Sequence, residues 1–438
     1  MKRGEKMSKT KHKVEAAPTA EKNKSVPVEE TAAVSEPAPQ AEIAAAATAV
    51  KPVKPYYAGI DIVKILAVFL VVSIHFFLYN GFYYTPLTDR SCVVPIVFRW
   101  FAYTCVPLFM ISTGYLMKNK TFSLGYYKGI IKILVIYVVV AIINVKFNIA
   151  HYGHTFDTWK LLKGFFEYSN ANYAWYVNYY VALFMLIPFL NLAFNGLKTR
   201  NQKLMLVITV TCVTVMARSF FLGFEKDNQI RVFPDYLSGA YPLAYYYAGA
   251  YIREYPPKRN LKNKLLALVL FCASLFFISY STYRQTLAND ADDHHFLSWH
   301  FNDYSSYPIF FLTLSIFILL FDITTKNKGV KFVLRQISGA TLATYLISYV
   351  FDNTFYNSFQ REEKGQIVEY IGFNNKYPEL LDKFSHWYEI VLKNFGLALL
   401  CGLVIHNLYN LAEWLIKKAV AKIKARKSSD SAEAAADS

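Results

Sequence analysis

Apolar runs long enough to cross a membrane recur from Tyr56 almost to the end of the chain, separated by short polar or charged segments. A helix of about 20 apolar residues spans the hydrocarbon core of a bilayer, because lipid leaves the backbone no hydrogen-bond partner outside the helix. The pattern therefore predicts an all-α, polytopic membrane helix bundle with about ten transmembrane helices. The predicted spans are residues 57–79, 93–117, 129–150, 173–195, 203–223, 237–253, 264–283, 305–323, 333–352 and 388–416.

Basic residues occur in alternate connections between these spans and again after the last one. Because lysine and arginine close to a span favour the cytoplasmic side, both termini are predicted to be cytoplasmic. The remaining connections are neutral or acidic. The basic connections contain Lys118, Lys120 and Lys128; Lys198, Arg200 and Lys203; Arg253, Lys258, Arg259, Lys262 and Lys264; and Lys326, Lys328 and Lys331, whereas Asp290, Asp292, Asp293 and Asp303 fall in an alternate one.

The two ends of the chain differ in composition from the predicted transmembrane domain, residues 55–418. Residues 1–54 are rich in Ala, Pro, Glu and Lys, a composition that buries too little apolar surface to fold, so they are predicted to form a disordered cytoplasmic tail. Residues 419–438 form a second cytoplasmic tail, first basic and then acidic. The longest outer segment, about 353–387, is either a lid over the outer mouth of the bundle or a plain solvated connector.

Charge and cysteine content narrow the choice of partners. The net charge of +16 would suggest nucleic acid in a soluble protein. Here the basic residues lie beside apolar spans, where they face anionic lipid headgroups, so we expect membrane lipids and no nucleic acid as partners. The five cysteines show neither a disulfide framework nor metal-ligand spacing, and no metal is expected.

The first predicted span carries three ionisable residues, Asp61, Lys64 and His75. At about 100° per residue all three lie in one sector of the helix, and His75 stands roughly 16 Å beyond Lys64 along its axis. Asp61 and Lys64 either form an interfacial i,i+3 pair or serve a site inside the bundle. His75 is either a hydrogen-bonded interhelical histidine or a functional group in a cavity.

The second span contains Arg99 in its outer half, followed by Pro107, Ser112 and Gly114. An arginine is costly in lipid, so Arg99 belongs inside the bundle or at its outer rim as an interfacial anchor. Pro107 predicts a bend, because proline cannot complete the helical hydrogen-bond pattern. Ser112 and Gly114 are small enough to allow the close approach of a neighbouring helix.

Several of these segments resemble motifs of the membrane acyltransferase-3 family. Ten residues separate Lys64 from His75, which is similar to the first-helix signature of that family, where arginine, ten residues and histidine recur. The other resemblances follow the family's order along residues 57–352. They are Val106–Leu116 with the helix-2 motif, Trp175–Pro188 with the helix-4 motif, Tyr245–Arg253 with the midpoint helix and Ser338–Ile347 with the late helix.

The sequence departs from the family pattern at three positions. Lys64 stands where arginine is usual, which keeps the charge but loses the bidentate fork that suits phosphate or carboxylate. Ser348 stands where many members carry a second histidine, and Thr113 interrupts a serine-glycine pair that is more often contiguous. A mechanism that needs two histidines is therefore not expected.

The resemblance implies transfer of an acyl group, most often acetyl, from cytoplasmic acyl-CoA to a hydroxyl of a cell-envelope glycan or polysaccharide, by an enzyme of the cell membrane. It implies a catalytic role for His75, whose side chain suits a base with a pKa near neutrality. It further implies that Lys64 and Ser112 bind the acyl-CoA donor and that Arg99, Trp175 and Tyr345 bind the substrate. Direct transfer and a covalent acyl-histidine both remain open.

A transporter or flippase for a lipid-linked or small solute is the main alternative, since an even number of helices and a polar midplane suit both functions. Secondary transporters commonly contain an internal repeat of broken helices, and the two halves of this sequence show no clear repeat. A scaffold or acyl-sensing protein is a third hypothesis, under which His75 would be dispensable.

Overall fold

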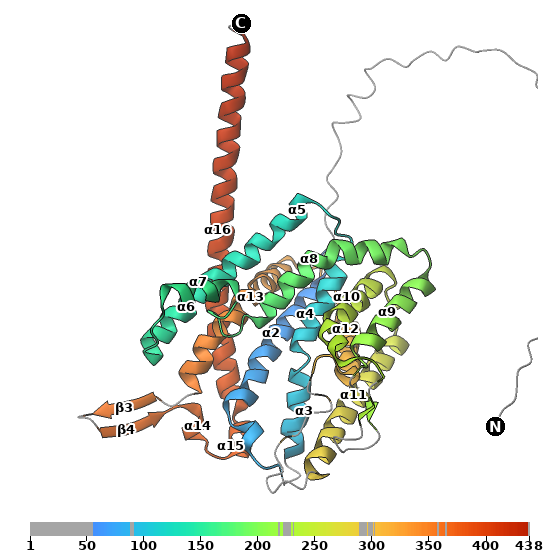
Figure 1. The fold of residues 1–438 in the computed structure, drawn as a ribbon, viewed down its shortest axis with the longest axis vertical. Helices are drawn as coiled ribbons and strands as arrows, with labels where there is room; N and C mark the ends of the chain where they lie inside the picture. The colour runs from blue at the N-terminus through green and yellow to red at the C-terminus, as the bar shows by residue number, and fades with distance from the viewer. Residues whose placement is uncertain are drawn as a thin grey trace, which may run out of the picture. The chain divides into compact units, whose positions relative to one another are not determined.

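Helices dominate the fold, and the strands form two short antiparallel pairs (Figure 1). The computed structural model describes residues 56–87, 92–217, 220–221, 229–230, 232–288, 296, 301, 303–356, 359–363 and 366–436. The predicted N-terminal tail and the aspartates of 290–293 lie outside the described residues. From Tyr56 onward the chain forms one unit.

The centre of the bundle is formed by α2 (Ala58–Tyr79) and by the pair α3 (Val93–Ala102) and α4 (Cys105–Met117). Their most apolar stretches are 61% and 67% buried by the rest of the protein. The long helix α13 (Lys328–Phe355) packs along α2. Lys64, His75, Arg99 and Ser112 thus lie on the helices that are most shielded from lipid.

The predicted second span is one apolar run with a break. The helix is interrupted at Tyr103 and Thr104, and Pro107 is the third residue of α4. Proline has no N–H to donate and its ring clashes with the carbonyl four residues earlier, which here belongs to Tyr103. The bend expected from Pro107 is therefore present, one turn before the proline itself.

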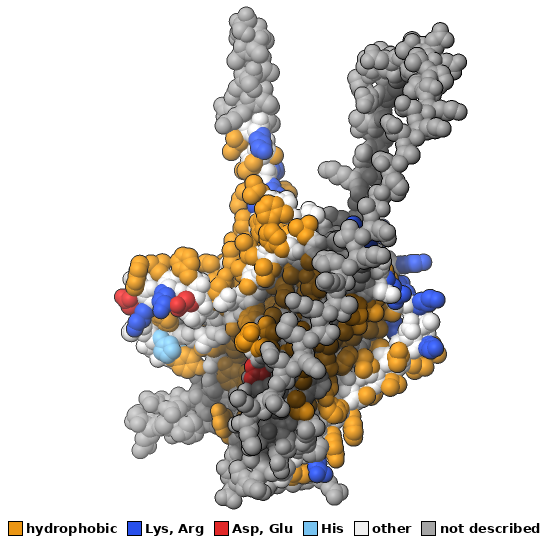
Figure 2. Space-filling model, turned by 45° about the vertical axis from the view of Figure 1, so that its right-hand side comes forward, with side chains coloured by type: hydrophobic (Ala, Val, Ile, Leu, Met, Phe, Trp, Pro, Cys, Tyr) orange, Lys and Arg blue, Asp and Glu red, His pale blue; other side chains and the backbone are white. Residues whose placement is uncertain are grey.

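Outer helices surround this centre and expose large apolar side chains, as the broad field of hydrophobic side chains in Figure 2 shows. Only 33% of the apolar stretch is buried in the spans that contain α6 and α11, and 28% in the span within α16. Such surfaces suit lipid contact. These outer helices are α6 (Ile131–Tyr152), which follows α5 (Leu124–Tyr127) and η3 (Lys128–Ile130), α7 (Thr158–Phe166), α8 (Trp175–Gly196), α11 (Leu261–Ala288) and α16 (Trp387–Ala436).

Six helices of the described chain are long and apolar enough to cross a membrane, so the predicted count of ten is not confirmed. Three predicted spans are helices of 14 or 15 residues, which at about 1.5 Å per residue fall short of a bilayer core. The predicted span 333–352 is a full-length helix, part of α13, but polar residues lower its hydropathy. The short helices are α9 (Arg200–Thr214), α10 (Tyr241–Glu254) and α12 (Tyr307–Leu320).

The predicted span 203–223 is wrong in its second half. Its helix, α9, ends at Thr214, and the chain then forms the strand pair β1 (Phe220–Phe221) and β2 (Gln229–Ile230). The next span begins as the 3-10 helix η5 (Asp235–Ala240) and continues as α10. Pro242 occupies the second position of α10, where a proline costs no helical hydrogen bond.

Ion pairs join the basic connections at one end of the bundle. Glu254 pairs with Lys118 at 2.5 Å and with Lys203 at 2.6 Å. Asp322 pairs with Lys264 at 2.5 Å and with Arg259 at 3.7 Å. The four connections predicted to be cytoplasmic therefore lie on the same side of the bundle, as the alternating charge pattern requires. Which membrane face that side occupies stays a prediction.

The outer segment 353–387 is packed against the bundle in its second half. It contains the hairpin β3 (Phe359–Glu363) and β4 (Gln366–Ile371), which extends away from the helices in Figure 1, and then α14 (Phe373–Lys376) and α15 (Leu380–Ser385). The rings of Phe373 and Phe384 lie 6.1 and 6.4 Å from that of Phe76, and Lys383 Nζ donates to the carbonyl of Asn80 at 3.1 Å. These short helices cover the outer end of α2, which fits a lid better than a solvated connector.

Candidate active site

Lys64 and His75 of α2 each form a polar contact with α13. Lys64 Nζ donates to the carbonyl of Ser338 at 3.0 Å and to its hydroxyl at 2.9 Å. Farther along both helices, His75 Nδ1 lies 2.7 Å from Asp352 Oδ2. The two contacts are 11 residues apart on α2 and 14 apart on α13, both close to whole numbers of helical turns. Each helix therefore presents both of its residues to the other.

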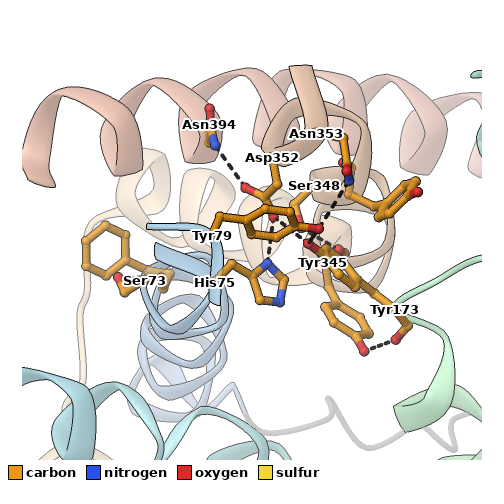
Figure 3. Close-up of polar contacts among 11 residues, drawn as sticks. Ser73, His75, Tyr79, Tyr173, Tyr345, Ser348, Asp352, Asn353 and Asn394 are labelled. Carbon is orange, nitrogen blue, oxygen red and sulfur yellow. Dashed lines mark hydrogen bonds and ion pairs between the residues drawn. The ribbon is translucent and has the colours of Figure 1, made fainter. Parts of the chain in front are cut away.

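The carboxylate of Asp352 is fully buried and accepts hydrogen bonds on both oxygens (Figure 3). Asn394 Nδ2 donates to Oδ1 at 2.9 Å, and the hydroxyl of Tyr173 donates to Oδ2 at 2.9 Å. We assign the proton of His75 to Nδ1, because an ionised carboxylate can only accept. The Nε2 atom then keeps its lone pair, and Figure 3 shows this second nitrogen pointing away from Asp352.

Aromatic residues fix the position of the His75 ring. The centroid of the Tyr173 ring lies 4.1 Å from that of His75, and the hydroxyls of Tyr173 and Tyr79 are 3.0 Å apart. Asn353 Nδ2 donates to the Tyr79 hydroxyl at 3.2 Å. His75 is thus the interhelical, hydrogen-bonded histidine that the sequence offered as one alternative. His75 is also a candidate functional group in a cavity, which was the second alternative, because its side chain lines one.

The cavity beside His75 has a volume of about 400 Å³, and we call it the His75 cavity. All three residues predicted to bind the substrate, Arg99, Trp175 and Tyr345, line it. Arg99 is buried inside the bundle rather than anchored at the rim. Its guanidinium lies 4.2 Å from the ring centroid of Trp100 and 4.3 Å from that of Tyr103, and its Nε donates to the Tyr83 hydroxyl at 3.2 Å.

A second cavity, the Lys64 cavity, has a volume of about 250 Å³ and lies toward the end where the basic connections meet. Lys64 and Ser112, the two residues predicted to bind the donor, both line it together with Lys132 of α6. Ser112 donates its hydroxyl to the carbonyl of Leu108 at 2.7 Å. Asp61 and Lys64 form no ion pair in the described structure, so the interfacial i,i+3 pair is not formed.

Three residues of the site escaped the sequence analysis. Asp352 lies at the end of the predicted span 333–352 and Lys132 near the start of the span 129–150. Both are ionisable residues in apolar segments, which is the signal that could have found them. Tyr173 carries no comparable signal. Ser348 lies one turn before Asp352 and donates to the carbonyl of Tyr345 at 2.8 Å, so the partner of His75 on this helix is Asp352.

A bundle of apolar helices that encloses a histidine–carboxylate pair beside a cavity defines an integral membrane protein with an enzyme-like site. The model of the acyltransferase-3 family, described as an acyltransferase domain, matches residues 57–409. The chain belongs to this family and is a membrane acyltransferase. The matched region contains every site residue named above. No curated protein and no solved structure gives a significant match to the chain.

Proposed function

We propose that this enzyme transfers an acyl group from cytoplasmic acyl-CoA to a hydroxyl of an extracytoplasmic glycan or envelope polymer, and that the acyl group is acetyl. The proposal rests on the arrangement of two cavities along the axis of α2. The Lys64 cavity lies toward the basic connections, and the His75 cavity lies 11 residues farther along that helix. A donor from one side and an acceptor from the other would meet near His75, in the cell membrane.

The Lys64 cavity suits the acyl-CoA donor. Lys64 and Lys132 bring two ammonium groups to its wall, and Lys132 Nζ is otherwise bound to Asn410 Oδ1 at 3.1 Å. Ammonium groups attract the phosphates of CoA as point charges. The rest of the wall is mainly apolar and includes Phe109 and Ile136, which suits the uncharged thioester end of the donor.

The His75 cavity suits a sugar acceptor. Trp175, Tyr304 and Tyr103 give it flat aromatic walls, on which the apolar face of a sugar ring can pack. Arg99 adds donors for hydroxyl or carboxylate oxygens of the acceptor. A few polar groups among aromatic walls orient a ligand while burial supplies most of the affinity.

The proposed chemistry follows from the tautomer of His75, in which Nδ1 carries the proton and Nε2 keeps its lone pair. Its Nε2 takes the proton of the acceptor hydroxyl as that oxygen attacks the carbonyl carbon of the thioester. The carbon–sulfur bond breaks, the proton passes from Nε2 to the leaving sulfur, and the products are an ester and CoA thiol. Asp352 holds the ring in the tautomer that leaves Nε2 free and balances the charge of the imidazolium.

Comparison of wild-type cells, cells lacking the gene and cells expressing His75→Gln at matched abundance tests the proposal. Mass spectrometry of the isolated envelope polymers should find base-labile acetyl esters in the wild type alone. Equal acylation in all three would contradict it. A transporter or flippase would instead leave an unexported intermediate inside the cells that lack the gene.

A further inference from the structure

Tyr345 of α13 lines both cavities. It lies one turn before Ser348 and two turns before Asp352 on the same helix, and its side chain is buried. A donor held in the Lys64 cavity and an acceptor held beside His75 are therefore separated by this ring.

Three contacts hold the ring in place. Its hydroxyl donates to the backbone carbonyl of Tyr173 (Figure 3). Its ring stacks with the Tyr173 ring at a centroid distance of 6.3 Å and an interplanar angle of 15°, and it forms a T-shaped pair with the ring of Tyr176 at 6.3 Å and 80°. Tyr173 also donates to Asp352, so the ring is anchored on a residue that positions His75.

We propose that Tyr345 is the gate between the Lys64 and His75 cavities and that its ring limits the length of the acyl chain the enzyme transfers. The proposal rests on the function proposed above. The thioester carbonyl has to come within reach of the hydroxyl bound at His75, and the ring of Tyr345 stands on that route. Rotation of the ring about its side-chain bonds breaks one hydrogen bond to the backbone and opens a passage. A narrow passage admits an acetyl group more readily than a longer chain.

Substitutions at this position separate the ring from its hydrogen bond. Tyr345→Phe keeps the ring and removes the hydrogen bond to Tyr173, so the gate should open more often. Tyr345→Ala removes the ring and joins the cavities. Tyr137→Phe is a matched control, because Tyr137 is also buried and donates to backbone carbonyls, at 3.1 and 3.3 Å, but lines neither cavity.

The first measurement uses purified enzyme with acetyl-CoA or butanoyl-CoA and no acceptor, and follows the release of CoA thiol. Water that crosses the open gate hydrolyses the thioester to a carboxylic acid and CoA thiol. Hydrolysis should rise several-fold in both Tyr345 variants and stay unchanged in Tyr137→Phe. With envelope polymer as acceptor, the ratio of butanoyl to acetyl transfer should rise about tenfold or more in Tyr345→Ala, since one methylene is worth roughly 10–200-fold in a closed pocket.

The second measurement does not depend on acyl transfer. Cys105 lines the His75 cavity but not the Lys64 cavity. In a form that keeps only this cysteine, a membrane-impermeant thiol reagent is added on the side of the basic connections. Cys105 should react slowly in the parent form and many-fold faster in Tyr345→Ala, with a smaller increase in Tyr345→Phe.

The two measurements distinguish the possible failures. Unchanged labelling and unchanged acyl selectivity in folded Tyr345→Ala would overturn the gate. Faster labelling without turnover of any acyl-CoA by any form would keep the gate and reject the proposed function. If Tyr345→Ala does not fold, the test rests on Tyr345→Phe. Labelling of Cys105 and hydrolysis of acyl-CoA at the same rates as in the parent form would then overturn the proposal.

Discussion

His75 and Asp352 are 277 residues apart in the chain, yet their side chains meet at 2.7 Å in the interior of the bundle. The pair joins the C-terminal parts of α2 and α13, and Asn394 of α16 and Tyr173 donate further hydrogen bonds to the carboxylate. The relationship gives the imidazole a defined tautomer and orientation beside a cavity. Substitution of either residue therefore tests its role in the pair.

Asp352→Asn should lower the rate of acyl transfer by about 10²–10⁴-fold, because an amide can impose the wrong tautomer on the ring and cannot balance its positive charge. The KM for acyl-CoA should change little, since Asp352 does not line the Lys64 cavity. Turnover of purified protein measures both. Ser348→Ala is the control, because that hydroxyl is bound to its own helix, and it should keep nearly wild-type kcat. A wild-type rate in Asp352→Asn would remove the residue from the mechanism.

His75→Gln should fold and insert normally but lose acyl transfer by about 10²–10⁴-fold, because an amide forms hydrogen bonds but cannot take up the proton. The double variant with Asp352→Asn should be no slower than His75→Gln alone, since the two residues act as one unit. Steady-state kinetics at equal membrane abundance would show this. Multiplied losses in the double variant would mean that Asp352 acts independently of His75.

Lys64→Ala and Lys132→Ala should each raise the KM for acyl-CoA with a smaller effect on kcat, because their ammonium groups are expected to bind the donor in the ground state and transition state alike. Lys64→Arg should retain activity if a phosphate is the partner. Lys146 lies on the same helix as Lys132, is exposed and lines neither cavity, so Lys146→Ala is the control. If neither Lys64→Ala nor Lys132→Ala changes the KM, the role of Lys64 is limited to its hydrogen bonds with Ser338.

Glu254→Gln should destabilise the protein by about 1–3 kcal/mol at neutral pH, because the carboxylate joins α10 to Lys118 and Lys203. Burial alone would raise the pKa of Glu254, but the two ammonium groups outweigh it and lower the pKa to about 2 from the usual 4.5. A lowered pKa in the folded state stabilises above the unfolded-state value and ceases to do so as the pH falls through the folded-state value. The difference in unfolding midpoint between wild type and variant should therefore be constant above about pH 4.5 and close toward pH 2.

The exposed pair of Lys163, on α7, and Glu167, which directly follows that helix, provides the control for this measurement. Glu167→Gln should leave the unfolding midpoint nearly unchanged, because exposed pairs contribute little. A difference for Glu254→Gln that persists at the same size down to pH 2 would show that the ion pair is not its source.

A reporter fused after Ser429 should be cytoplasmic, and a tag near Asp292 should be accessible from outside the cell. Both follow from the basic connections, which lie at one end of the bundle. Protease protection or reporter activity in intact cells measures the two positions. If both report the same side, the chain crosses the membrane an even number of times between Asp292 and Ser429, and the assignment of the two cavities to the two sides has to be revised.

The amino-acid sequence by itself determined that this is a helical membrane protein of the acyltransferase-3 family. Hydropathy is a sum over neighbouring residues, so α2, α6, α8 and α11 follow from local composition alone. Helical periodicity likewise placed Lys64 and His75 on one face of α2, because the geometry of a single helix does not depend on its neighbours. The motifs around these residues were sufficient to identify the family, which the matched region 57–409 confirms.

Only the tertiary structure decided which distant groups meet. Asp352 is recognisable in sequence as an acidic residue at the end of a span, but its pairing with His75 depends on α13 packing alongside α2 at one particular register. The two cavities and the position of Tyr345 between them depend on several helices at once. The early end of α9 also escaped prediction, because a 15-residue helix beside protein neighbours needs no full apolar span to be stable. Local sequence patterns carry the periodicity of one helix, whereas packing between helices selects the partners of its polar residues.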